Sequence, residues 1–89
     1  MNEAQYVRTK ELLSADVGNH LVALDADEGL CYGFTSVVAS VWRELAEPRS
    51  FEGLKRFLLD EYEISEEQCA AKLSNLLDDF VAKGLVRRT

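Results

Sequence analysis

The stretch "EGLCYGFTSVVASVWREL", residues 28–45, decides how the rest of the chain is interpreted. Gly29 favours the left-handed turn that closes a hairpin loop, and the aromatic residues of Leu30–Phe34 favour a returning strand. Thr35 and Ser36 then offer N-cap oxygens for a helix. Four apolar residues follow at the i, i+3, i+4, i+7 spacing of one helix face: Val38, Val41, Trp42 and Leu45. The stretch therefore predicts a strand that leads directly into an amphipathic helix.

Two more strand segments are predicted upstream of this stretch. "HLVALD", residues 20–25, alternates in polarity and is bounded by the turn-forming sequences "DVGN" and "DADEG". Residues 6–13 are a weaker candidate, because the tyrosine and valine there favour a strand but two adjacent leucines interrupt the alternation. Together with Leu30–Phe34, these segments predict a three-stranded antiparallel meander.

A second helix is predicted after Pro48, which ends the first one. Ser50 offers an N-cap oxygen, and the helical pattern runs to about Glu63. The apolar residues on the inner side of this helix are Phe51, Leu54, Phe57, Leu58 and Tyr62. We expect Leu54 and Phe57, together with Trp42 of the first helix, to belong to the hydrophobic core.

A third helix, over residues 66–83, has the clearest terminal signals. Ser65 with Gln68 three residues later has the spacing of a capping box, and Gly84 stands at the C′ position. One side of the helix carries a broad apolar arc: Cys69, Leu73, Leu76, Leu77, Phe80 and Val81. The arc is wider than a single small partner helix requires, so we expect part of it to face a groove.

These elements predict an α+β fold in which a three-stranded antiparallel sheet is followed by three helices, resembling a winged helix-turn-helix. The length of 89 residues fits a single domain over residues 1–89. Such a domain can bury a core, but it is too small for a deep enzyme cleft.

The charge balance argues against nucleic acid and membrane partners. Ten basic and sixteen acidic residues give a net charge of −6, which repels polyphosphates and anionic lipids and attracts basic partners. A DNA recognition helix needs cations near its first turns, where the third predicted helix carries Glu66 and Glu67. Residues 1–10 lack the apolar segment of a signal peptide, so we expect a cytoplasmic protein.

Residues that could support catalysis or metal binding are few. Cys31 and Cys69 lie 38 positions apart without a CxxC spacing, and His20 is the only histidine. The acidic run "DEYEISEE" lacks the alternate ligands and central glycine of a calcium loop. We therefore expect no metal, no cofactor, no disulfide and no enzymatic activity.

The sequence resembles the PqqD-like family, the peptide-recognition elements of ribosomal natural-product biosynthesis, over residues 24–86. The similarity lies in the hairpin "LD…G" before an aromatic strand, in the helix ending "VWREL" and in the final "LLDDFVAKGLV". The family usually has Leu-Asn where this chain has Phe34 and Thr35. Threonine is also an N-cap residue, so this departure leaves the predicted fold intact.

The resemblance implies a module that binds the leader segment of a precursor peptide, as an added strand along Leu30–Phe34 that packs against the third helix. Main-chain partners would come from Cys31, Tyr32 and Gly33, and the missing side chain of Gly33 would let the guest approach closely. The expected peptide-binding residues are Leu30, Cys31, Tyr32, Gly33, Phe34, Cys69, Lys72, Leu73, Leu76 and Asp79. Leucines would form the floor, and Lys72 and Asp79 the charged rim.

Two alternatives remain open from the sequence. Tyr32, Phe34, Leu73 and Leu76 are at least as consistent with ordinary core positions as with a groove. The sequence is most similar to the stand-alone elements of lasso-peptide biosynthesis. This similarity implies a leader peptidase and a cyclase as partners, and the acidic net charge favours a basic leader. A PqqD-type chaperone for a radical enzyme in quinone-cofactor synthesis, or a winged-helix interaction adaptor, are the other readings.

Overall fold

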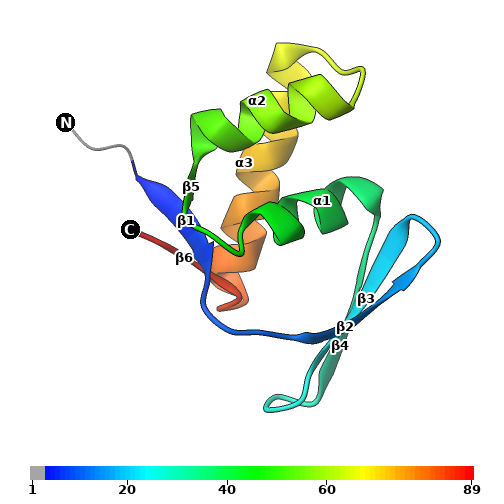
Figure 1. Ribbon diagram of the computed structural model, residues 1–89. Helices are drawn as coiled ribbons and strands as arrows, with labels where there is room; N and C mark the ends of the chain where they lie inside the picture. The colour runs from blue at the N-terminus through cyan, green and yellow to red at the C-terminus, as the bar shows by residue number, and fades with distance from the viewer. Residues whose placement is uncertain (1–3) are drawn as a thin grey trace.

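The computed structural model describes residues 4–89 and contains two small sheets and three helices (Figure 1). The predicted α+β class, with a three-stranded antiparallel sheet and three helices, is confirmed, and a second three-stranded sheet is added to it. The elements, in chain order, are β1 (Gln5–Arg8), β2 (Leu13–Val17), β3 (His20–Asp25), β4 (Leu30–Phe34), α1 (Ser36–Glu44), β5 (Arg49–Ser50), α2 (Phe51–Glu61), α3 (Glu66–Ala82) and β6 (Val86–Arg88).

The predicted meander is present, with the strand order β2-β3-β4. Its β3–β4 hairpin closes as expected, because Gly29 adopts a φ of +69° and its N–H donates to the Asp25 carbonyl at 2.8 Å. The strand predicted over residues 6–13 is correct in part: residues 6–8 lie in β1, but β1 belongs to the other sheet, and the meander begins with β2 at Leu13. The chain crosses between the two sheets at Leu12, whose side chain enters the core.

The polarity of β2 is the reverse of that of an ordinary half-buried strand. The register pairs Ser14 with Ala23 and Asp16 with Leu21, so the polar residues of β2 lie on the side that faces α1. Asp16 forms an ion pair there with Arg43 of α1. All five β2 residues are exposed, so the sequence offered no buried alternation from which to predict this strand.

The second sheet, of order β5-β1-β6, brings the two ends of the described chain together. Tyr6 pairs with both Arg49 and Arg88, and the Thr89 N–H donates to the Gln5 carbonyl at 2.8 Å. The Arg8 N–H donates to the carbonyl of Leu45 at the end of α1. We refer to β5-β1-β6 as the terminal sheet; the sequence analysis did not predict it.

The helices begin where the sequence predicts. The Gly53 N–H donates to Ser50 Oγ at 3.0 Å in α2, and the Gln68 N–H donates to Ser65 Oγ at 3.2 Å in α3. Thr35 is the N-cap residue of α1 by its backbone, although its side chain makes no capping hydrogen bond. At the end of α3 the Leu85 N–H donates to the Phe80 carbonyl at 2.9 Å, as in a Schellman motif. The second helix ends at Glu61, two residues earlier than predicted.

An aromatic cluster joins the meander to the helices. The ring centroids of Phe34, Trp42 and Phe80, which come from β4, α1 and α3, lie 5.6 to 5.7 Å apart in each pair. Trp42 and Leu54 are buried as predicted, whereas Phe57 is only half-buried against the core. None of the helices within residues 4–89 is long and apolar enough to cross a membrane.

Candidate functional site

Strand β4 is one of the two edges of the meander, and β2 is the other. In the described part of the chain β4 pairs only with β3, from Leu30 opposite Asp25 to Phe34 opposite Leu21. In an antiparallel ladder alternate residues direct their N–H and C=O groups away from the partner strand, so this edge offers unpaired donors and acceptors. The strand sequence "LCYGF" contains no charged residue that would oppose pairing with another strand.

The side chains of β4 divide between the two faces of the sheet. Tyr32 and Phe34 lie on the helix side, where Phe34 is buried and Tyr32 half-buried. Cys31 and Gly33 lie on the opposite, exposed side. A Cβ atom added at Gly33 would meet nothing within 4 Å, so the backbone is accessible there.

A hollow of about 330 Å³ lies between β4 and the C-terminal half of α3. At its rim Lys83 Nζ contacts Asp79 Oδ2 at 2.8 Å and lies 5.8 Å from the centroid of the Tyr32 ring. We call this the strand-side hollow, and its lining residues are Cys31, Tyr32, Gly33, Phe34, Val38, Leu76, Asp79, Phe80, Lys83 and Leu85.

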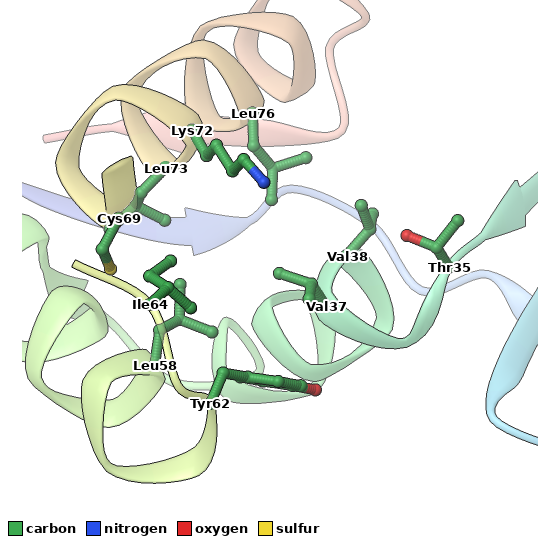
Figure 2. A pocket seen from close by; sticks show the side chains of 10 residues that line it. All are labelled: Thr35, Val37, Val38, Leu58, Tyr62, Ile64, Cys69, Lys72, Leu73 and Leu76. Carbon is green, nitrogen blue, oxygen red and sulfur yellow. The ribbon is translucent and has the colours of Figure 1, made fainter. Parts of the chain in front are cut away.

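A second hollow, of about 320 Å³, lies between the three helices (Figure 2). Its walls are mostly aliphatic. The Tyr62 hydroxyl is hydrogen-bonded to Ser40 Oγ at 2.9 Å and donates to the Ser36 carbonyl at 3.3 Å. We call this the helical hollow, and its lining residues are Thr35, Val37, Val38, Leu58, Tyr62, Ile64, Cys69, Lys72, Leu73 and Leu76.

The two hollows are adjacent, because Val38 and Leu76 line both of them. We call the combined feature the α3 groove. Tyr32 and Lys83 line its strand-side hollow, and Tyr62 and Ile64 line its helical hollow. A bound segment along β4 would therefore have an apolar trough beside it.

The α3 groove brings together nine of the ten residues predicted for peptide binding. Cys69, Lys72, Leu73 and Leu76 line the helical hollow, and the four residues from Cys31 to Phe34 line the strand-side hollow with Asp79. Leu30 lines neither hollow and is half exposed at the start of β4. Leu73 and Phe34 are buried and so also serve the core, whereas Tyr32 and Leu76 are half-buried.

The opposite wall of the groove was missed by sequence reasoning. Val37, Tyr62 and Ile64 come from α1 and from the connection between α2 and α3. The only signal for them was that Ile64 and Cys69 have the spacing of a hydrophobic staple, which predicts a contact near the start of α3. Whether these side chains lie close to Val38 depends on how the helices pack against one another, which the sequence pattern does not specify.

The buried cysteine of the groove, Cys69, is not an activated nucleophile. Burial raises the pKa of the Cys69 thiol, whose Sγ lies 3.7 Å from the Lys55 carbonyl, so the thiol stays protonated at neutral pH. Within residues 4–89 no group of three or more histidine, cysteine, aspartate or glutamate side chains is placed to hold a metal ion. The arrangement is suited to binding a chain segment.

A buried ion pair supports the hairpin that carries β4. Lys10 Nζ contacts Asp25 Oδ2 at 2.7 Å, and the Glu28 N–H donates to Asp25 Oδ1 at 3.2 Å. The hydrogen bond from Lys10, followed by the one from Glu28, lowers the pKa of the Asp25 carboxyl, and the same contact raises the pKa of Lys10. Asp25 therefore ties the hairpin loop to the segment between β1 and β2.

Comparisons with known proteins agree with this architecture. Residues 20–86 match the family described as coenzyme PQQ synthesis protein D (PqqD). The chain is similar to the structure of TbiB1 in complex with the TbiA(beta) leader peptide, with a TM-score of 0.78 and 21% identity over 91% of this chain and 94% of that one. It is also similar to a lasso peptide synthetase B1 complexed with the leader peptide, with a TM-score of 0.76 and 20% identity over 92% and 96% of the two chains.

No curated protein sequence matches the chain significantly. The two structural likenesses are below 25% identity and establish the shared fold. The family match covers β3, β4, the three helices and the first residue of β6, including every residue that lines the α3 groove. The chain belongs to the PqqD family.

Proposed function

We propose that this protein binds the leader segment of a ribosomally made precursor peptide and presents it to modifying enzymes. The observation that carries the proposal is the unpaired, uncharged edge of β4 lying directly beside the apolar α3 groove. In support, both similar structures are of proteins in complex with leader peptides.

The mode of binding follows from the two parts of the site. A leader that adds as a fourth strand forms main-chain hydrogen bonds with β4, which supply affinity with little demand on sequence. Every second side chain of that strand faces α3, where the two hollows accept apolar groups. Backbone pairing thus provides affinity, and the groove provides selectivity.

The pathway we favour is lasso-peptide biosynthesis, in which a leader peptidase and a cyclase would receive the bound precursor. The likeness to a lasso peptide synthetase B1 supports this assignment. A second candidate is a peptide chaperone for a radical enzyme in quinone-cofactor synthesis, which the description of the matched family supports. In both cases the protein acts by binding and presentation, and the modifying enzyme performs the chemistry.

The experiment is a titration with the labelled leader of the short precursor peptide encoded beside this protein's gene. A second series carries a single N-methyl group at each successive leader residue. Because strand addition uses alternate amides of the guest, we expect micromolar or tighter binding that is lost with a period of two residues. Binding without this periodicity would overturn strand addition, and no binding of the unmodified leader would overturn leader recognition.

Two variants of the protein test the proposed pairing between the leader and β4 by changing β4 instead of the leader. Gly33→Pro introduces a residue without an N–H into β4, and we expect it to weaken leader binding more than about tenfold. Gly33→Ala keeps the N–H group, and its Cβ meets no atom of the protein within 4 Å; it should bind the leader more tightly than Gly33→Pro, and any loss it shows measures the close approach of the guest at this position. Thermal unfolding of both variants establishes whether the meander is intact. If Gly33→Pro is unfolded, the N-methyl series decides.

A further inference from the structure

Some charged residues of the α3 groove form ion pairs within the protein, and one does not. Asp79 and Lys83 contact each other at 2.8 Å, and Lys83 also lies over Tyr32. Lys72, by contrast, has no carboxylate within 4 Å among residues 4–89, whereas Lys10, Lys55 and Lys83 all form ion pairs. In a chain with sixteen acidic residues, the one lysine left without an ion pair in the described region lines the helical hollow.

Among residues 4–89, Lys72 is also the only charged residue that lines the helical hollow. Figure 2 shows its side chain extending from α3 along the hollow toward Leu76, above the aliphatic walls formed by α1 and α2. Two hydroxyl groups also line this hollow: that of Tyr62 already has partners in Ser36 and Ser40, and that of Thr35 carries no charge. A bound segment would therefore meet a single unsatisfied charge at this position.

Covering the groove changes the environment of that charge. Lys72 is exposed in the unbound protein, so water solvates its ammonium group. A strand laid along the groove removes part of that water, which disfavours the charge unless the guest supplies a carboxylate. The long lysine side chain retains some access to solvent, so the penalty is moderate rather than prohibitive.

We infer that Lys72 is a specificity residue that selects leaders carrying an aspartate or glutamate at the position facing the helical hollow. This inference rests on the proposed function. It differs from the expectation of a basic leader, because the net charge of −6 acts at long range, whereas Lys72 acts at contact distance. Lys72 and Lys83, the C-cap residue of α3, are eleven residues apart, about 16 Å, which is about five strand residues. Because alternate guest side chains face α3, the carboxylate should lie about four or six residues from the guest residue beside Tyr32.

A charge-exchange series with the same synthetic leader tests the inference. Each aspartate or glutamate of the leader is replaced singly by its amide, and binding is measured to the original protein and to Lys72→Gln. We expect one replacement to weaken binding to the original protein about fivefold, and the same replacement to have no further effect in Lys72→Gln. In Lys72→Glu, a lysine at that leader position should restore the lost affinity.

Arg56→Gln is the control for net charge. Arg56 is an exposed cation of α2 that lines neither hollow, so its removal changes the total charge of the protein equally and should leave affinity within about twofold. Leader binding that is insensitive to both Lys72→Gln and Lys72→Glu would overturn the inference while leaving the proposed function intact. A leader that binds without any aspartate or glutamate would also overturn it. A leader that fails to bind the original protein would overturn both.

Discussion

The two sheets of the molecule have opposite kinds of edge. The terminal sheet ends in β5 and β6, which are two and three residues long and contain Arg49, Arg87 and Arg88. Short, positively charged edges of this kind oppose pairing with another chain. The meander ends in β2, which contains the charged Asp16, and in β4, which is five residues long and uncharged. The difference indicates that pairing is prevented where the chain closes on itself and permitted beside the α3 groove.

The largest expected effect comes from removing the side chain that supports both sheets. The Trp42 ring contacts Phe34 of β4, and the Arg8 guanidinium of β1 lies 5.0 Å from its centroid. Trp42→Ala should lower the free energy of unfolding by about 3–5 kcal/mol, measured by urea denaturation. Val81→Ala, on an exposed part of α3, should change it by less than about 0.5 kcal/mol. Similar losses in both variants would contradict a shared support at Trp42.

The next effect separates binding from folding. Leu76 is half-buried and lines both hollows, so Leu76→Asp should weaken leader binding at least about tenfold while the protein remains folded at 25 °C. Fluorescence titration and thermal unfolding measure the two quantities. Val81→Asp places the same charge elsewhere on α3 and should bind normally. Equal binding by both variants would argue that the guest does not enter the groove.

A smaller effect, confined to the meander, depends on pH. Because the pKa of Asp25 is lowered from 3.8 in the folded protein, its contribution to stability is present above that value and is lost as the pH falls through the lowered pKa. The pKa of Lys10 is raised from 10.5, so its contribution is lost only as the pH rises beyond that value.

Asp25→Asn should therefore have a lower Tm than the original protein by a nearly constant amount between about pH 5 and pH 9, with convergence in stronger acid. Circular dichroism melting across this range provides the measurement, and Lys10→Met should show the same acid convergence. A difference between Asp25→Asn and the original protein that persists unchanged at pH 2 would show that the carboxylate charge is not the cause.

The smallest effect is expected on the outer face of the meander. Leu13 and Val17 of β2 are 69% and 60% exposed. Leu13→Ser should change the free energy of unfolding by less than about 0.5 kcal/mol in urea denaturation. A loss above about 1 kcal/mol would mean that this face of the meander contributes to the packing of the monomer.

The features predicted correctly from the sequence are those set by residues close to one another along the chain. The start of α3 was predicted because the Ser65 side chain caps the N–H of Gln68, three residues later. The end was predicted because Gly84 acts on the helical turn just before it. The wall of the groove formed by α3 was likewise predicted, since a helical repeat places Cys69, Lys72, Leu73 and Leu76 on one face.

What could not be predicted depends on contacts between distant segments. β2 carries its apolar residues outward, so only pairing with β3 identifies it as part of the meander. The isolation of Lys72 is equally invisible in the sequence, because it results from the other lysines finding carboxylates elsewhere; Lys55 contacts Glu66 eleven positions away, for example. Both features require the three-dimensional arrangement.

The pairing of β1 with β6 also determines how the module can be attached to another protein. Gln5 and Thr89 are hydrogen-bonded to each other, and Figure 1 shows β1 and β6 on the side of the molecule away from β4. A flexible linker joined at either end would thus start from nearly the same point and leave the peptide edge unobstructed. Linkers of equal length at the two ends should hold a bound precursor at a similar effective concentration near a fused enzyme.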